Sequence, residues 1–281
     1  YSNTYFVEQS FLDINKIYYD AEVNAANFSD LSTVDLINDW VSDKTHEKIP
    51  EIIQEIPAEA VLYLINAIYF NGTWTKEFNP ESTQKFSFET GNGDYVQTDM
   101  MGRRDSLNYF VNETFSAIEL PNGKGNFNMM VMLPNYDKTV AEVINQFTPA
   151  NWEKWQEAFV HTNSIDIRLP KFKIEFEIML NNILQSMGMQ QAFTASADFS
   201  GINPARDLFI SYVKHKTFVE VDEEGTEAAA VTIIGFEVTS VQPDNPKWIS
   251  FYCTRPFLFA ITEKDTGAIL FMGKVGDPTK K

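Results

Sequence analysis

The sequence is poor in cysteine and in positive charge, and each shortage excludes a class of structure or partner. Cys253 is the single cysteine, which excludes a disulfide within the chain. The 22 Lys and Arg residues against 39 Asp and Glu residues give a formal net charge of −17. Phosphate backbones and anionic membrane surfaces repel such a chain. We therefore expect neither nucleic acid nor a membrane as a partner.

The motifs of common enzyme and metal sites are also missing. The three histidines, His46, His161 and His215, lie far apart, and none stands in HExxH or beside a spaced cysteine pair. The patterns GxSxG, GxxxxGK[ST] and GxGxxG do not occur. The sequence therefore predicts no metal site, no cofactor and no enzyme activity.

Long apolar runs and separating linkers are absent as well. No run approaches the roughly 20 residues that a membrane helix needs, and no signal-peptide pattern stands at the start. The chain opens inside TYFVEQSFL, which reads as a strand, so we expect further sequence before it. With 44% hydrophobic and 14% aromatic residues, the chain can bury a sizeable core. We predict a single domain over residues 1–281.

Hydrophobic spacing indicates an α+β fold. Helical spacing occurs around Ile37 and Trp40, behind an expected cap at Ser32 with Asp35 three residues later. It recurs at 137–147 and 178–188. Alternating or continuously apolar runs predict strands, and they cover 60–70, 106–119, 127–133, 163–177, 207–221, 248–262 and 267–275. Strands and helices follow one another without a βαβ rhythm, which favours several sheets.

Two polar residues lie inside predicted strands. Asn66 interrupts the apolar run VLYLINAIYF, where a buried amide without a hydrogen-bond partner costs about 1–3 kcal/mol. His215 lies in ISYVKHKTFVEV. From the sequence alone, the better interpretation of both is a structural role.

Residues 220–243, EVDEEGTEAAAVTIIGFEVTSVQP, form the most unusual stretch of the chain. The glutamates at 223, 224 and 227 favour solvent, Gly225 lets the backbone pivot, and the alanines at 228–230 offer little bulk against repacking. The tract that follows has strong β propensity but ends in the loop-like QPDNP. Composition leaves two interpretations open: a hinge before a switching segment, or a small turn before an ordinary edge strand.

Several motifs resemble the serpin family of serine protease inhibitors. EEGTEAAA, a variable tract and then RPFLFAITEKDTGAILFMGKVGDP resemble its reactive-centre hinge and C-terminal strands. NAIYFNGTW, LPKFKIEFE and ADFSGI resemble other serpin segments in family order. The resemblance implies a serpin fold with a large central β-sheet, further β-sheets and surrounding helices. It also implies that roughly the first quarter, several helices and a strand, is missing.

The resemblance also implies a mechanism. A serpin presents a reactive loop, here about 223–246, and a target protease attacks it to form an acyl-enzyme. The cleaved loop then adds to the sheet as a strand and distorts the protease before it can deacylate. The hinge residues would be Gly225, Thr226, Glu227, Ala228, Ala229 and Ala230. One face of the inserted strand would carry Thr226, Ala228, Ala230, Thr232 and Ile234, without charge or proline.

Five further residues match positions that control opening of the sheet in the family. Asn66 and His215 resemble a pair that hydrogen-bonds across the sheet where its strands part. Lys171 and Glu223 match a salt bridge where the loop enters the sheet, and Trp74 matches the aromatic packed there.

A loop of the usual family length, counted from Gly225, places the cleaved bond between Thr239 and Ser240, with Val238 and Phe236 as alternative specificity residues. Because 225–246 contains no Lys or Arg, we expect an elastase-like or subtilisin-like target serine protease. Cysteine endopeptidases are a second target class.

The alternative function is a non-inhibitory serpin that acts as a carrier, a storage protein or a chaperone. The small residues at 228–230 favour inhibition, because non-inhibitory members often have bulky or charged residues there. The resemblance further implies a monomer and an extracellular or cell-envelope location.

Overall fold

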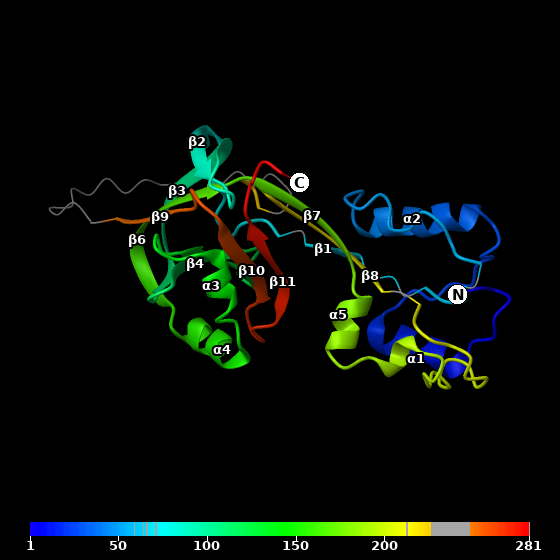
Figure 1. The fold of residues 1–281 in the computed structure, drawn as a ribbon. Helices are drawn as coiled ribbons and strands as arrows, with labels where there is room; N and C mark the ends of the chain where they lie inside the picture. The colour runs from blue at the N-terminus through cyan, green and yellow to red at the C-terminus, as the bar shows by residue number, and fades with distance from the viewer. Residues whose placement is uncertain are drawn as a thin grey trace. The chain divides into compact units, whose positions relative to one another are not determined.

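The computed structural model describes residues 1–58, 60–63, 65, 67–70, 72–211, 213–225 and 248–280 (Figure 1). By their internal contacts they form two compact units. The first comprises Tyr1–Tyr69 and Glu175–Phe218, and the second comprises Phe70–Ile174 and Val219–Lys281. The interpretation of 1–281 as a single domain stays a prediction.

The first unit carries helices around a small apolar cluster. Its elements are α1 (Gln9–Tyr19), α2 (Ser32–Lys44), β1 (Ala67–Tyr69), α5 (Asn181–Ser186) and η2 (Gln191–Phe193), with parts of β7 (Phe172–Met179) and β8 (Lys214–Val221). Val41 of α2 packs with Ile49, Ile52, Ile53 and Phe218 in its core. Helical spacing explains this contact, because Ile37 and Val41 face the cluster one turn apart while Leu36 is exposed.

Two local expectations for this unit are wrong. The stretch TYFVEQSFL contains no strand, and α1 begins inside it at Gln9. Phe11, Ile14 and Tyr18 follow the helical period, and the Asn15 side chain donates to the Phe11 carbonyl at 2.8 Å. Ser32 does not cap α2, because its hydroxyl donates to Asp30 at 2.8 Å and the cap position is Leu31.

β1, β8 and β7 form a three-stranded sheet in that order. β1 runs parallel to β8, with Ala67 opposite Lys216 and Tyr69 opposite Phe218. The predicted strands 60–70 and 207–221 are therefore neighbours in one sheet. Both are shorter than predicted, since β1 begins at Ala67 and β8 at Lys214.

The second unit is built on an eight-stranded sheet. The strand order is β11-β10-β5-β4-β3-β6-β9, with β2 paired to β3. The strands are β2 (Gln84–Glu89), β3 (Tyr95–Val111), β4 (Phe115–Asn122), β5 (Phe127–Pro134), β6 (Val160–Pro170), β9 (Ile249–Tyr252), β10 (Phe257–Glu263) and β11 (Ile269–Val275). The continuously apolar run of β10 is explained by its burial on both faces.

Several predicted strands are broken at polar or proline residues. The run 106–119 splits into β3 and β4, because the Asn112 side chain accepts bonds from the amides of Thr114 and Phe115 and forms a turn. β6 ends at Pro170 and β10 begins after Pro256, which lacks an amide donor. β2 was not predicted, because it has no apolar run: five of its six residues are exposed, and Phe88 is the one buried residue.

Two short helices cover one face of this sheet. α3 (Val140–Ile144) begins with a capping box formed by Thr139 and Glu142, and α4 (Pro149–Glu157) begins behind Thr148. Val143 and Trp155 pack on inward residues of β4, β5 and β10, namely Phe115, Ala117, Met130, Met132, Leu258 and Ala260. α4 was not predicted, although Thr148 and Pro149 are a helix-start signal.

In the described part of the chain, no helix is long and apolar enough to cross a membrane. The same residues contain no group of three or more His, Cys, Asp or Glu side chains arranged to hold a metal ion.

We predict that Phe115→Ala destabilises the second unit by about 3–5 kcal/mol. Phe115 is fully buried and meets Trp155 edge-to-face with ring centroids 5.0 Å apart. Phe86→Ala, which removes a ring that is 39% exposed, is the matched control and should cost far less. Urea denaturation followed by tryptophan fluorescence measures both. Equal losses in the two variants would contradict the assignment of Phe115 to the core.

Candidate functional site

The candidate site begins where β8 ends at Val221. The next four residues form a tight turn: the Asp222 carboxylate accepts from the amides of Glu224 and Gly225 at 3.0 and 3.2 Å. The Asp222 amide in turn donates to the Gly225 carbonyl at 3.0 Å. We call residues 222–225 the hinge turn. Its geometry follows from the sequence, because aspartate bonds readily to backbone amides two residues ahead.

No residue other than glycine fits at position 225 of this turn. Its φ is +134°, a conformation that side chains disfavour. A Cβ there would lie 2.5 Å from the Gly72 carbonyl oxygen and 2.6 Å from the Trp74 amide. Gly225 also forms an antiparallel bridge with Thr73. The hinge turn is therefore pressed against the backbone of residues 72–74, and only glycine allows this approach.

The Glu223 carboxylate is buried behind the turn and is fully partnered. Lys171, between β6 and β7, lies 2.6 Å from Oε2, and the Thr83 hydroxyl donates to Oε1 at 2.7 Å. The Glu223 carbonyl accepts from the Phe78 amide at 2.8 Å. Two segments far apart in the sequence, residues 78–83 and the junction of β6 and β7, therefore converge on one glutamate.

These contacts shift the pKa of both partners. Burial opposes the charge of Glu223, but the bonds from Lys171 and Thr83 outweigh it and hold its pKa below the ordinary value. Burial likewise opposes the charge of Lys171, yet the bond to Glu223 and the nearby carboxylates raise its pKa. The ion pair is therefore charged over the neutral range.

Trp74 ties residues 72–78 to the hinge turn. It is 3% exposed, its indole donates to the Asp222 carbonyl at 2.9 Å, and its amide donates to the Glu224 carbonyl at 2.9 Å. Its ring meets Phe78 edge-to-face. The indole and the ion pair thus hold the same four-residue turn.

Trp248, which directly precedes β9 (Ile249–Tyr252), is a second point at which this part of the chain is held. The Arg104 guanidinium lies over the Trp248 ring, 5.0 Å from its centroid. β9 then pairs in parallel with β6, and the Tyr252 hydroxyl donates to Asp166 at 2.9 Å. Residues 225 and 248 are both held within the second unit.

The structure brings together Trp74, Lys171, Glu223 and Gly225, four of the residues singled out from the sequence. Their role in opening a sheet stays a prediction. His215 is the second residue of β8. The remaining predicted residues lie outside the described residues: Asn66, Thr226, Glu227, Ala228, Ala229, Ala230, Phe236, Val238, Thr239 and Ser240.

Sequence reasoning missed three residues of this site. Asp222 is recoverable from local sequence, because an aspartate three residues before glycine is a turn signal. Thr83 and Phe78 carry no such signal, since each meets Glu223 across 140 or more residues of chain. Only the folded backbone joins them to the hinge turn.

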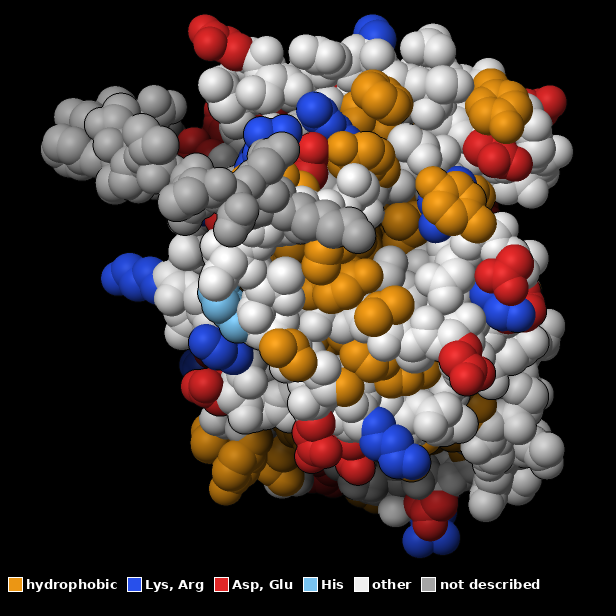
Figure 2. All heavy atoms as spheres, turned by 90° about the vertical axis from the view of Figure 1, so that its left-hand side faces the viewer, with side chains coloured by type: hydrophobic (Ala, Val, Ile, Leu, Met, Phe, Trp, Pro, Cys, Tyr) orange, Lys and Arg blue, Asp and Glu red, His pale blue; other side chains and the backbone are white. Residues whose placement is uncertain are grey.

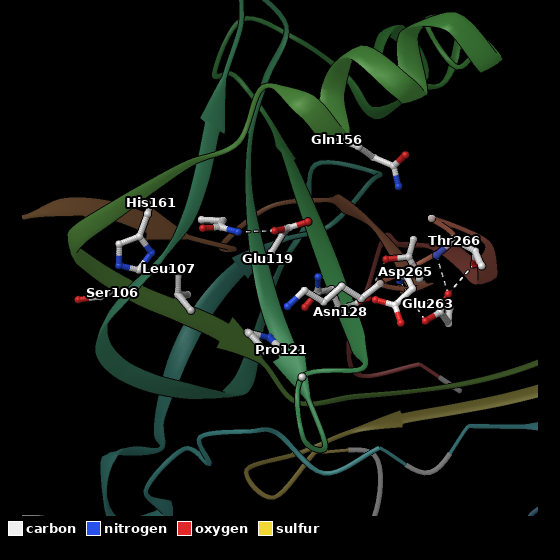
Figure 3. A pocket seen from close by; sticks show the side chains of 15 residues that line it. Ser106, Leu107, Glu119, Pro121, Asn128, Gln156, His161, Glu263, Asp265 and Thr266 are labelled. Atoms are coloured by element: carbon white, nitrogen blue, oxygen red, sulfur yellow. Dashed lines mark hydrogen bonds between the residues drawn. The ribbon is translucent and has the colours of Figure 1, made fainter.

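A separate hollow of about 600 Å³ lies on the eight-stranded sheet beside α4 (Figure 3). Glu119, Asn128 and Gln156 line it from β4, β5 and α4. Glu263 lines it from the end of β10, and Asp265 lines it from the turn that follows. Burial raises the pKa of Glu119, although a bond from Asn108 acts against the shift. The hollow is polar and carries more acidic than basic groups.

One face of the molecule is drawn with all its atoms in Figure 2. Hydrophobic side chains gather in its middle, and the Lys and Arg side chains on the described part are scattered among Asp and Glu. This face has no continuous basic patch among those residues.

The comparisons with known proteins agree with this architecture. A family model described as serpin (serine protease inhibitor) matches residues 1–278. A serpin-like protein of Methanosarcina acetivorans is 37% identical, with 98% of this chain and 64% of the relative covered. The native structure of tengpin, a thermophilic serpin, has a TM-score of 0.85 and 33% identity, covering 97% of this chain and 70% of that one. Human thyroxine-binding globulin complexed with thyroxine has a TM-score of 0.86 and 29% identity, covering 99% and 73%.

The fold is therefore the mixed α+β serpin fold. The chain belongs to the serpin family, whose members are typically protease inhibitors and include extracellular and intracellular proteins. It spans 64% of the length of its archaeal relative.

We predict that Glu223→Gln flattens the loss of stability in acid. A carboxyl whose folded pKa is depressed contributes stability that is present above its unfolded pKa, 4.5 for glutamate, and lost as the pH falls through the folded value. The parent should therefore melt at a steadily lower temperature as the pH falls below about 5, and the variant should lose part of this drop.

Glu119→Gln is the control of opposite sign. Because the folded pKa of Glu119 is raised, this group gains stability as the pH falls, and its removal should steepen the acid loss. Identical slopes for the parent and Glu223→Gln would contradict the assigned role of the ion pair.

Proposed function

We propose that the protein is a suicide-substrate inhibitor of serine endopeptidases rather than an enzyme. The observation that carries the proposal is the hinge turn, which holds Gly225 at the start of an alanine-rich segment by contacts that can be broken and remade. Family membership supports the same reading. In this mechanism, the protease forms an acyl-enzyme with the loop, and the cleaved loop then adds to the sheet as a strand.

The composition of 226–234 supports insertion. An added strand exposes alternate residues to each face, and one face would carry Thr226, Ala228 and Ala230 followed by Thr232 and Ile234. None of these is charged or proline, so neither desolvation of a charge nor a missing amide would oppose strand pairing. The hinge residues therefore permit rapid insertion.

The contacts of Glu223 give the proposal its control step. Loop insertion beside β8 requires the backbone of 222–225 to leave residues 73–78, which breaks the bonds to Trp74 and Phe78. We propose that Lys171, Trp74 and Glu223 hold the hinge turn until cleavage, and that Asn66 and His215 control parting of the strands. These residues regulate opening and carry out no bond chemistry.

We propose an elastase-like or subtilisin-like target, since the stretch 225–246 lacks Lys and Arg. Cysteine endopeptidases are the second target class. A monomeric protein outside the cell or in the cell envelope suits such a target.

A second candidate is a non-inhibitory carrier. Thyroxine-binding globulin, a structural neighbour, was determined with bound thyroxine, and this chain has a hollow of about 600 Å³ beside α4. The many carboxylates around this hollow favour a polar ligand with cationic or hydroxyl groups. The next two experiments separate this candidate from inhibition.

We predict that Ala228→Arg in the full-length protein converts the inhibitor into a substrate. The arginine would enter the buried face of the added strand without a partner, which slows insertion while deacylation continues. A cost above ~1.4 kcal/mol slows insertion more than about tenfold and raises the stoichiometry of inhibition accordingly. Ala229→Arg, on the opposite face, is the matched control and should inhibit nearly as the parent does. Unchanged stoichiometry for Ala228→Arg would count against insertion.

We predict that attack falls between Thr239 and Ser240. An elastase-like or subtilisin-like enzyme should form a detergent-stable complex with the full-length protein, because the acyl bond remains on Thr239. Mass spectrometry should then find a released C-terminal peptide that begins at Ser240. A peptide that begins at Thr239 or Glu237 would correct the bond and leave the mechanism in place. Complete turnover without a covalent complex would exclude inhibition and favour the carrier.

A further inference from the structure

The turn between β4 and β5 grips the same backbone segment as the hinge turn, from the other side. Asn122, the last residue of β4, is fully buried, and its side-chain amide donates to the Gly72 carbonyl at 2.9 Å. Asn122 also forms a backbone bridge with Trp74. Neither the sequence patterns nor the comparisons assign this residue a role.

Three more bonds strengthen this grip. The Gly123 amide donates to the Thr73 carbonyl at 2.6 Å, and the Thr75 amide donates to the Pro121 carbonyl at 2.9 Å. The Thr75 hydroxyl donates to the Gly123 carbonyl at 2.9 Å. Residues 72–75 therefore lie between two partners, the β4–β5 turn and the hinge turn.

Asn122 does not contact the hinge turn in any hydrogen bond of the described residues; it bonds to the Gly72 carbonyl, and that carbonyl lies against Gly225. The Gly72 carbonyl oxygen that accepts its bond also lies 2.5 Å from where a Cβ on Gly225 would lie, as close as the Thr73 Cα. The Gly72 carbonyl is therefore one of the backbone groups against which Gly225 packs directly. Asn122 is the one side chain of the described β4–β5 turn that bonds to this carbonyl.

We propose that Asn122 is a positioning residue for the hinge, which fixes the Gly72 peptide and thereby sets how readily residues 222–225 detach. The proposal deepens the inhibitory function proposed above and rests on it for its biological meaning. The geometry itself is independent of that function. Loss of the bond removes one restraint on the Gly72 carbonyl, and the Thr73–Gly225 bridge and the Trp74–Glu224 bond then open more often.

The test is hydrogen exchange in Asn122→Leu, which keeps the size of the side chain and removes the donor. The amides to follow are those of Trp74 and Phe78, which donate to Glu224 and Glu223. We expect both to exchange about tenfold faster, the effect of losing one hydrogen bond. Amides between β4 and β5, such as those of the Ala117–Met132 pair, should keep the parent rate.

Asn135→Leu is the matched control. Its side-chain amide also donates to a backbone carbonyl, that of Asn112 at 3.1 Å, at the opposite end of the same strand pair. This variant should leave exchange at Trp74 and Phe78 unchanged. A merely structural role of Asn122 would instead speed exchange throughout β4 and β5 in Asn122→Leu. That result, or unchanged exchange at Trp74 and Phe78, would overturn the proposal.

A kinetic measurement links the same variant to function. The protease for this measurement is one that the parent inhibits. Asn122→Leu should raise the rate of loop insertion about tenfold, because the hinge turn detaches more readily, and should leave the rate of complex formation unchanged. Equal changes in both rates would overturn a role confined to the hinge. If the parent inhibits no protease, the inhibitory function fails, whereas the exchange result still decides whether Asn122 holds the hinge.

Discussion

The close approach of Gly225 to residues 72–74 is the constraint on which the rest of the site depends. Two backbones meet there with no side chain between them, and the contact forms only because residue 225 has no Cβ. Trp74 and Glu223 take their partners from this arrangement, since each bonds to the backbone of the opposite segment. A displacement of a few tenths of an ångström would therefore disturb several bonds together.

In the opening proposed above, the buried carboxylate of Glu223 would make this contact reversible rather than permanent. An apolar side chain in place of Glu223 would gain no hydrogen bonds to water when the hinge turn leaves its buried position, because it has no polar group to hydrate. Glu223 instead exchanges bonds from Lys171 and Thr83 for bonds to water when the turn opens. A buried ion pair of this kind adds little net stability, because the desolvation of the charges offsets their attraction, but it specifies one geometry for the segment that it holds.

The eight-stranded sheet supplies the rigid part of the site. Lys171 directly follows β6, and Ile165 to Arg168 of the same strand pair with β9, so one strand supports both the hinge turn and the segment that follows Trp248. The core under α3 and α4 fixes β4 and β5 and hence the turn that holds Gly72. These strands thus hold residues 225 and 248, which flank the segment 226–247, and the composition of that segment suits the strand insertion proposed above.

Local sequence determined a large part of this protein. The spacing of Ile37 and Trp40 predicts α2, the apolar run of β10 predicts a buried strand, and EEGTEAAA with the C-terminal strands indicates the family. Each signal lies within a few neighbouring residues. Chain breaks such as the turn at Asn112 were missed because side-chain bonds to the backbone compete with β propensity.

Tertiary structure alone decided the partners. Glu223 meets Thr83 across 140 residues and Asn122 meets Gly72 across 50, and no local pattern records either contact. The sequence supplies a glutamate, a threonine and an asparagine of ordinary appearance. Strand pairing brings the threonine to the hinge turn and the asparagine to the Gly72 carbonyl beside it. The sequence does not predict these contacts, because hydrogen bonds act over about 3 Å and sequence distance does not fix spatial distance.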